Sequence, residues 1–194
     1  MRRRRVDGER RTKLLDEVAE LLLAEGFTTV SMDDLAQRLR CSKATLYSVA
    51  GSKEQLVVRV TKEFFREATE QIEVAVAAVA NPRLRISAYL SGVGEAMSRC
   101  SSDFYTDMIG FGPTADIYRA NSDAAARRVQ ELIAAGVEEG SLRKIDGNFA
   151  GQLVALAIEG VQSGMLLRRT GLTAGEAYQE MADLLLHGLS RPGA

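Results

Sequence analysis

The sequence is poor in the residues on which enzymes, metal sites and disulfide scaffolds depend. Among its 194 residues it has no tryptophan, three prolines, two cysteines and one histidine. Cys41 and Cys100 form no CxxC pair and do not stand at zinc-ligand spacing from His187, so neither a disulfide framework nor a zinc site is indicated. A catalytic Ser-His or Cys-His pair would have to use His187, close to the C-terminus. We therefore expect no metal, no cofactor and no catalytic residues.

Nucleotide-dependent and metalloprotease chemistry are disfavoured as well. The sequence has no P-loop lysine motif and no HExxH. Gly92-Val93-Gly94 does not open a GxGxxG motif, because Met97 occupies the position of the third glycine. We expect that the protein is not an enzyme.

Long apolar runs are also missing. No stretch approaches the roughly 20 apolar residues that span a bilayer. The basic N-terminus is followed by Val6-Asp7-Gly8-Glu9 rather than by the apolar core of a secretory signal. Apolar residues recur at helical spacing and are interrupted mainly by glycine, which favours helices over strands. We expect an all-α, cytoplasmic protein without membrane contact.

Charge is unevenly distributed along the chain, although the net charge is only −1. Residues 1–62 contain 13 basic and 9 acidic residues, whereas the remainder contains 12 basic and 17 acidic residues. The N-terminal part is therefore suited to phosphates and the rest is not.

Residues typical of helix starts and ends occur at several points in the chain. Ser31 with Asp34 and Ser52 with Gln55 have capping-box spacing, Ser42 can cap a short helix, and Gly26 can end the first one. The helix from Ser52 is apolar-periodic over some 28 residues, roughly 42 Å, and should join both halves of the chain. We expect the helix at 114–140 to be kinked or broken near Asn121. The expected helices are 9–25, 32–39, 43–49, 52–79, 84–98, 103–109, 114–140, 149–169 and 174–189.

Two short helices joined by a tight turn are typical of a helix-turn-helix, whose second helix enters the major groove of DNA. The strings at 42–47 (SKATLY) and 51–56 (GSKEQL) closely resemble the recognition-helix and fourth-helix signature of the TetR family of repressors. EGF at 25–27 and SMDDLA at 31–36 fall at the family's usual upstream positions. The resemblance covers about residues 9–60.

The resemblance implies a helical DNA-binding domain at 1–51 and a helical ligand-binding and dimerisation domain at 52–194. It implies DNA contacts along the third helix, and at Lys53, where a lysine and free amides of a helix start suit a phosphate. A flexible arm of arginines could also track the minor groove. Lys43 as a solvated lysine, Tyr47 as a core residue and the arm as a solvated tail remain alternatives. The candidate DNA contacts are Ser42, Lys43, Ala44, Thr45, Tyr47, Ser48, Lys53, Arg3, Arg4 and Arg5.

Some residues depart from the family pattern. Val49-Ala50 stands where relatives usually have His-Phe or a similar pair, preceded here by Ser48. Asp33 replaces a commonly basic residue and should repel phosphate, and Arg40 replaces the usual turn glycine and must tolerate or avoid a positive φ. Base preference therefore cannot be transferred from relatives.

Aromatic residues and methionines concentrate between positions 89 and 118, where the helices are broken, and this favours an adaptable pocket for a small apolar or amphipathic effector. Plain core packing is the alternative. Two polar residues of the 149–169 helix could add hydrogen bonds. The candidate effector contacts are Tyr89, Met97, Phe104, Tyr105, Met108, Phe111, Tyr118, Glu159 and Gln162.

A stripe of small residues on the 149–169 helix permits close helix packing. Together with the helix at 124–139 it resembles the TetR dimer interface, although packing within one chain would use the same stripe. We therefore expect a homodimeric regulator, a repressor released from a pseudo-palindromic operator by an effector. A helical interaction protein and a DNA binder that senses no ligand are the alternatives. The small residues are Ala150, Gly151, Ala155, Ala157, Gly160 and Gly164.

Overall fold

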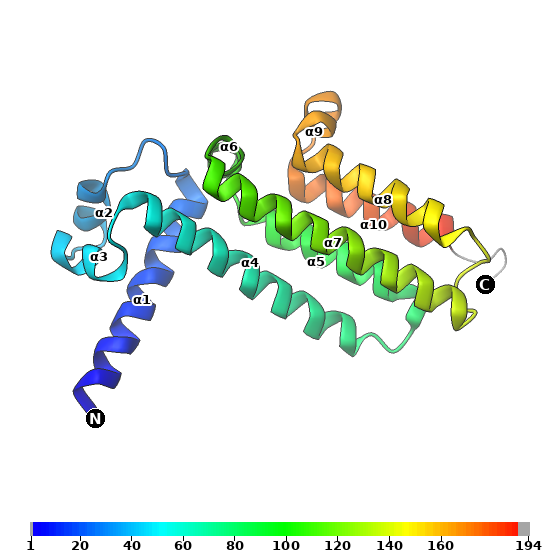
Figure 1. Ribbon diagram of the computed structural model, residues 1–194, viewed down its shortest axis with the longest axis horizontal. Coiled ribbons are helices and arrows are strands. Elements are labelled where there is room, and N and C mark those ends of the chain that lie inside the picture. The colour runs from blue at the N-terminus through cyan, green and yellow to red at the C-terminus, as the bar shows by residue number, and fades with distance from the viewer. Residues whose placement is uncertain (1, 190–194) are drawn as a thin grey trace. The chain divides into compact units, whose positions relative to one another are not determined.

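The structure is a computed structural model that describes residues 2–189, with side chains from Arg11 onward. This part of the chain is helical and contains no strand (Figure 1). No helix within it is long and apolar enough to cross a membrane. The elements are α1 (Arg2–Glu25), α2 (Met32–Arg38), α3 (Lys43–Val49), α4 (Lys53–Ala78), the 3-10 helix η1 (Pro82–Leu84), α5 (Arg85–Ser98), α6 (Ser102–Gly110), α7 (Gly112–Glu138), α8 (Gly147–Gln162), α9 (Met165–Thr170) and α10 (Ala174–Leu189).

The chain forms two compact units, and neither is continuous in sequence. Unit 1 comprises Met1–Phe65 and Arg99–Ile117, and unit 2 comprises Arg66–Ser98 and Tyr118–Ala194. Helices α4 and α7 each contribute residues to both units, and α6 belongs to unit 1. The sequence-based boundary at residue 51 stays a prediction of where the DNA-binding domain ends.

Unit 1 has a core built from one apolar face of each of its helices. These faces arise from apolar residues three or four positions apart, which fall on one side of a helix. Helices α1 and α4 each contribute several buried apolar residues, and α2 and α3 contribute one leucine each that is completely buried. The principal core residues are Leu14, Leu15, Val18, Leu22, Leu35, Leu46, Leu56 and Val60.

The predicted starts of α2, α3 and α4 are confirmed. The Ser31 hydroxyl accepts a hydrogen bond from Asp34 N (3.1 Å), and the Asp34 carboxylate accepts one from Ser31 N (2.9 Å), which completes a capping box. Ser42 caps α3 through Thr45 N, and Ser52 accepts from Gln55 N at the start of α4. These bonds satisfy amides that would otherwise have no partner, and they fix where each short helix begins.

Three helices differ from what the sequence predicts. Helix α1 begins at Arg2 rather than near position 9, so the arginines expected in a flexible arm have a helical backbone. Helix α7 runs from Gly112 to Glu138 without a break near Asn121. The helix expected at 149–169 is two helices, because Gly164 adopts a left-handed φ of 68° that ends α8 and starts α9.

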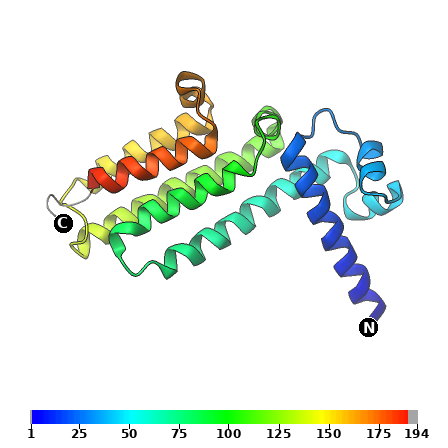
Figure 2. The same cartoon turned by 180° about the vertical axis from the view of Figure 1, so that it is seen from behind.

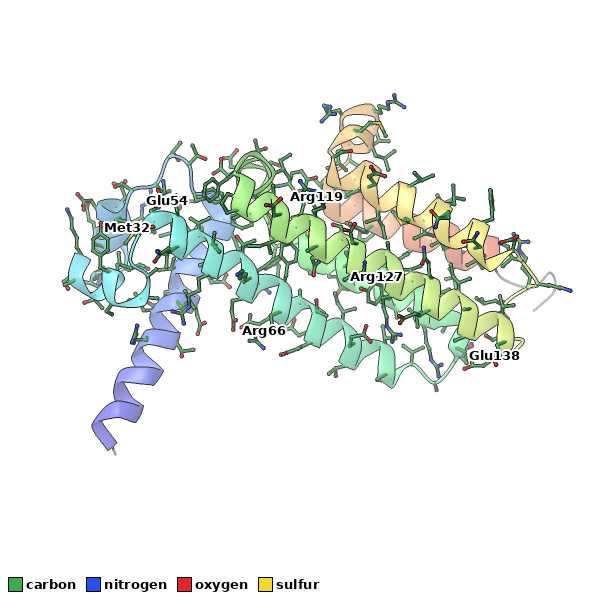
Figure 3. The ribbon with its side chains drawn as sticks, viewed as in Figure 1. Met32, Glu54, Arg66, Arg119, Arg127 and Glu138 are labelled. Carbon is green, nitrogen blue, oxygen red and sulfur yellow. The ribbon has the colours of Figure 1, made fainter. Side chains whose placement is uncertain are left out.

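Unit 2 is a layer of long helices in which α10 packs against α5 and α8 lies beside α10, as the view from behind also shows (Figure 2). The crossing of α5 and α10 is close, since a Cβ at Gly94 would lie 2.9 Å from the Gly175 carbonyl oxygen. On the other side, α7 exposes charged side chains, among them Arg119, Arg127 and Glu138 (Figure 3). Leu90, Val129, Ile133, Ile158 and Tyr178 are buried in the interior of the unit.

An ion pair between α4 and α7 ties unit 2 together at its half-exposed edge. The Arg128 guanidinium donates to both Glu73 carboxylate oxygens, at 2.8 and 2.9 Å, and also to Glu131 at 3.1 Å. Such a two-pronged arrangement fixes the relative position of the helices more strictly than a single contact does.

The turn between α2 and α3 is strained at Arg40. Its φ of 49° places a side-chain-bearing residue in the left-handed region, so of the two outcomes left open by the sequence, this position tolerates a positive φ. The turn is closed by Cys41 N donating to the Ala36 carbonyl (3.0 Å). The backbone is thus held in a conformation that glycine adopts at no steric cost.

Replacing Arg40 by glycine should stabilise the protein. The left-handed conformation costs a non-glycine residue about 1–2 kcal/mol, and the greater freedom of glycine in the unfolded chain offsets part of the gain, so we expect about 0.5–1 kcal/mol in the free energy of unfolding. Urea unfolding would measure it. Arg40→Ala is the control, because it removes the guanidinium but keeps the Cβ. An equal gain in both variants would attribute the effect to the charge rather than to the backbone.

Candidate functional site

Helix α3 presents most of its polar surface to solvent. All six candidates on or capping this helix are exposed, and Tyr47 has 49% of its surface accessible. Leu46 is completely buried and Val49 nearly so, and they attach the opposite face of α3 to the core. The Tyr47 ring therefore lies outside the core, which excludes the core alternative for this residue. The exposed residues are Ser42, Lys43, Ala44, Thr45, Tyr47 and Ser48.

Two arginines hold the C-terminal end of α3. Arg11 of α1 donates to the Ser48 carbonyl oxygen, and Arg59 of α4 donates to the Val49 carbonyl oxygen at 3.0 Å. The last carbonyls of a helix have no partner within it, and cationic donors suit the negative end of its dipole. Both neighbouring helices thus fix the position of α3. Neither arginine was singled out from the sequence, because they lie 37 and 10 positions from their partners.

Lys43 at the start of α3 forms an ion pair with Asp33 of α2. Both side chains are more than half exposed, so the pair is weak in water. The aspartate that departs from the family pattern thus neutralises the neighbouring lysine. An approaching anion would have to displace Asp33 to reach the Lys43 ammonium.

Lys53 is half-buried in the first turn of α4 and donates to the Thr28 carbonyl oxygen at 3.2 Å. Thr28 belongs to the turn between α1 and α2. An ammonium has three N–H donors, so this single hydrogen bond leaves donors that could meet a phosphate. The structure thereby links the candidate phosphate contact to the α1–α2 turn.

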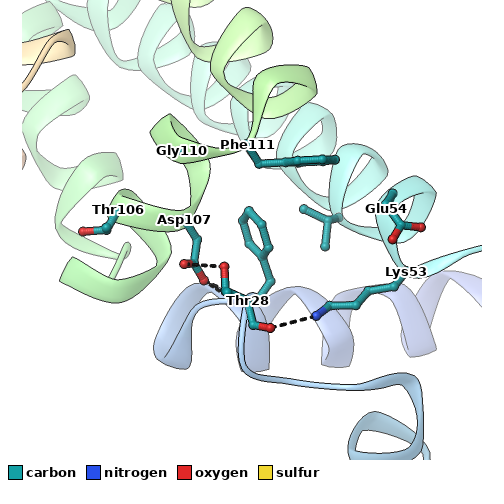
Figure 4. A pocket seen from close by; sticks show the side chains of 9 residues that line it. Thr28, Lys53, Glu54, Thr106, Asp107, Gly110 and Phe111 are labelled. Carbon is teal, nitrogen blue, oxygen red and sulfur yellow. Dashed lines mark hydrogen bonds between the residues drawn. The ribbon is translucent and has the colours of Figure 1, made fainter.

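A cavity of about 510 Å³ lies beside this contact, between the α1–α2 turn, the start of α4 and the end of α6 (Figure 4). The Phe27 and Phe111 rings pack edge to face at 6.2 Å, and Val57 adds a further apolar surface. Charged groups stand at Lys53, Glu54 and Asp107. The cavity is thus part apolar and part charged, with both signs of charge present.

The Asp107 carboxylate on α6 accepts three hydrogen bonds from the α1–α2 turn. Phe27 N and Thr28 N donate to Oδ2 at 2.6 and 2.7 Å, and the Thr28 hydroxyl donates to Oδ1 at 2.6 Å. Partial burial opposes ionisation, but the hydrogen bonds from Thr28 and Phe27 outweigh it and Lys53 adds attraction, so the pKa of Asp107 lies below its ordinary value. Asp107 is ionised at neutral pH. Nothing in the local sequence indicates this contact, which spans 80 positions.

The remaining DNA candidates, Arg3, Arg4 and Arg5, have side chains that lie outside the described residues. Their backbone belongs to α1. A contact between these arginines and DNA stays a prediction.

The effector candidates are divided between the two units. Tyr89, Met97 and Tyr118 are buried in unit 2. In unit 1, Phe104 and Met108 are completely buried and Tyr105 and Phe111 are half-buried, and the Phe104 ring packs against Phe27 at 5.8 Å. On α8, Glu159 is exposed and Gln162 is half-buried. The role of these nine residues stays a prediction.

The interior of unit 2 contains polar groups that sequence reasoning missed. Ser122 on α7 is 3% exposed, and its hydroxyl has no hydrogen-bond partner among the described residues. Burial together with the nearby Glu73 raises the pKa of Tyr89 to about 12, so this phenol stays protonated. A buried hydroxyl without a partner is uncommon and costs stability. Nothing in the local sequence around Ser122 distinguishes it from an exposed serine.

Within residues 11–189, no cluster of three His, Cys, Asp or Glu side chains could hold a metal ion. Cys41 and Cys100 are both half-buried thiols, and burial raises the pKa of Cys100 to about 12. A protonated thiol is a poor nucleophile and a poor metal ligand.

Comparison with known proteins agrees with the geometry of unit 1. Residues 14–60 match the model of the bacterial regulatory proteins of the tetR family. This range contains the core of α1, all of α2 and α3, and the start of α4. No curated protein matches the sequence.

Solved structures match over nearly the whole chain. A TetR/AcrR-family transcriptional regulator from Thermobifida fusca is 26% identical, with a TM-score of 0.66, and the match covers 94% of this chain and 100% of the other. The TetR-family regulator PfmR from Thermus thermophilus is also 26% identical, with a TM-score of 0.60 and coverage of 92% and 96%. A transcriptional regulator from Saccharomonospora viridis, solved with choline, is 18% identical and shares the fold, with a TM-score of 0.72 and coverage of 95% and 99%.

The helix-turn-helix of α2 and α3 with its exposed polar face, the family match over this segment and the matches over both units all agree. Residues 14–60 therefore form a DNA-binding domain of the bacterial tetR-family type, and the described part of the chain shares its fold with TetR-family transcriptional regulators.

Proposed function

We propose that the protein is a repressor that binds a pseudo-palindromic operator as a homodimer and leaves it when a small apolar or amphipathic effector binds. The observation that carries the DNA-binding part is the division of α3 into a buried and an exposed face. Leu46 and Val49 anchor the helix, while Thr45, Tyr47 and Ser48 stand free of the core. A helix held in this way can enter the major groove without losing its own packing.

The polar residues of α3 are suited to two kinds of DNA contact. The hydroxyls of Thr45 and Tyr47 can donate to and accept from base edges or phosphates, whereas Lys43 and Lys53 can neutralise phosphates. Phosphate contacts set affinity and depend on salt, whereas base contacts set sequence preference. We infer that Lys53 binds a phosphate of the DNA backbone.

The proposed dimer rests on an exposed apolar face of unit 2. On α8, Phe149, Leu153 and Leu156 have 56–66% of their surface exposed, and they recur at positions four and three apart, which places them on one side of the helix. Leu184 on the neighbouring α10 is 74% exposed. Apolar side chains gathered in this way favour an interface, and a two-fold pair of α8 and α10 would bury both faces.

This face differs from the small-residue stripe indicated by the sequence. Ala150 and Gly151 are buried within the chain, and a Cβ at Gly151 would overlap the side chain of Gln130 on α7. At these positions the structure therefore favours the alternative in which small residues pack within one chain. The large apolar residues beside them are the ones left for a partner.

The proposed effector site lies in the interior of unit 2. The buried Ser122 hydroxyl without a partner is the supporting observation, because a polar group of a ligand could supply the missing hydrogen bond. Buried Tyr89 adds an aromatic surface with a polar end. The regulator from Saccharomonospora viridis, which has the same fold, was crystallised with choline.

Operator binding in rising salt tests the DNA-binding function. Wild-type protein should bind a selected operator with an affinity that falls steeply as salt increases, because cations compete for the phosphates. Tyr47→Ala should weaken binding, and Lys53→Gln should both weaken it and reduce the slope of log affinity against log salt by about one. Fluorescence anisotropy would measure both quantities, and circular dichroism would check helicity. Unchanged affinity in both variants would refute the proposed DNA-binding surface.

Charge introduced on the exposed apolar face should separate the dimer. We expect Leu153→Glu to shift the protein toward monomer in sedimentation at micromolar concentration, because a pair of carboxylates would be desolvated at the interface. Exposed Val74 on α4 is a matched apolar control, and Val74→Glu should leave the mass unchanged. A wild-type monomer, with or without operator, would contradict the dimer.

Effector and operator should oppose each other's binding by the same factor. A coupling of about 1–3 kcal/mol corresponds to a change in affinity of roughly 5- to 150-fold in either direction. A thermal-shift screen would find a ligand, and calorimetry with and without saturating operator would measure the coupling. Ser122→Ala should weaken the ligand if its polar group meets this hydroxyl. Equal ligand affinity with and without operator would show that this ligand does not release the protein from DNA.

A further inference from the structure

The α1–α2 turn is held from two sides by groups of opposite charge (Figure 4). Lys53 of α4 donates to the Thr28 carbonyl oxygen, and Asp107 of α6 accepts from the Thr28 amide and hydroxyl and from Phe27 N. Thr28 therefore stands between the two charged side chains. Any shift of this residue moves the acceptor of Lys53.

The approach of Asp107 to the turn depends on the backbone at Gly26. This glycine has a φ of 79°, and a Cβ there would lie 2.7 Å from Asp107 Oδ2. Glycine alone accepts this conformation readily and also leaves room for the carboxylate. The sequence EGF at 25–27 thus fits a contact with α6 as well as the end of a helix.

Helix α6 is attached to the end of α1 and to the same turn by further contacts. Ser101 N donates to the Leu23 carbonyl oxygen at 2.8 Å, and the Phe27 ring packs edge to face against both Phe104 and Phe111. These contacts fix the helix that carries Asp107. The carboxylate is consequently held in place by packing, as a positioning group must be.

We propose that Asp107 is a positioning residue for DNA binding, which acts through Thr28 to hold the Lys53 ammonium where it meets a backbone phosphate. This inference rests on the proposed function, in which Lys53 is a phosphate contact. It assigns to α6, some 50 positions beyond the helix-turn-helix, a part in operator binding when no effector is present. Without Asp107, two backbone amides of the turn lose their acceptor, and the Thr28 carbonyl that orients Lys53 loses its fixed position.

The negative charge of Asp107 by itself lowers operator affinity, whereas its positioning of Lys53 raises it, and the variants below separate the two effects. A carboxylate near Lys53 repels phosphate, so its removal alone would strengthen operator binding. Asp107→Glu keeps the charge but moves the carboxylate by one methylene, and Asp107→Ala removes both. Asp103 is an exposed aspartate one turn earlier on α6, and Asp103→Asn is the matched control for loss of one negative charge.

The test is a double-mutant cycle between Asp107 and Lys53, read out as operator affinity over a range of salt. We expect Asp107→Ala and Asp107→Glu to weaken binding on the order of 5- to 10-fold, as for loss of one partly screened ionic contact, and to reduce the salt slope by about one, as Lys53→Gln does. The double variant Asp107→Ala/Lys53→Gln should be no worse than Lys53→Gln. Asp103→Asn should bind as tightly as wild type or slightly more tightly.

A purely structural role for Asp107 would lower affinity without changing the salt slope, and its effect would add to that of Lys53→Gln. That result would overturn the inference and leave the proposed function intact, as would full affinity in Asp107→Ala and Asp107→Glu. If Lys53→Gln itself changes neither affinity nor slope, Lys53 is not a phosphate contact and the inference fails with it. Failure of wild-type protein to bind any operator would instead refute the proposed function. Helicity and sedimentation identify any variant that misfolds, and Asp107→Glu is then the deciding variant.

Discussion

Helix α3 has seven residues, and a helix of this length is not stable in water by itself. Its conformation therefore depends on contacts made at both ends and on one face. Ser42 supplies the N-terminal cap, Leu46 anchors the middle, and the arginines of α1 and α4 hold the last carbonyls. The exposed polar side chains can face DNA only because this anchoring is complete without them. The other contacts of unit 1 can be understood as support for this arrangement.

The local features of unit 1 could be predicted from sequence because they depend on residues close together in the chain. A cap needs a hydroxyl and an amide three positions on, as at Ser31 and Ser42, and a buried face needs apolar residues at helical spacing. The family signature at 42–47 and 51–56 then predicted that these short helices form a helix-turn-helix. These are the parts that the structure confirms.

The contacts that could not be predicted join residues far apart in the sequence. Asp107 looks like an ordinary exposed aspartate until α6 is placed against the α1–α2 turn, and Ser122 looks like a solvated serine until α7 is packed. The glycines of α8 were ambiguous for a different reason, since a small residue permits close approach but does not indicate which helix approaches. Gly151 meets Gln130 of its own chain, and only the packed structure shows that Phe149, Leu153 and Leu156 remain exposed.

The discontinuity of unit 1 bears on how such regulators can be recombined. A chimera that joins residues 1–65 to the effector-binding part of another regulator would contain the helix-turn-helix but would lack Arg99–Ile117. The Phe27 ring would lose Phe104 and Phe111, and the two amides after Gly26 would lose their acceptor. A chimera of this kind therefore has to include α6 together with the helix-turn-helix. Otherwise the other regulator must itself provide a carboxylate and two aromatic rings at the same places. The helix-turn-helix and α6 belong to one structural unit, although residues 66–98 separate its two segments in the sequence.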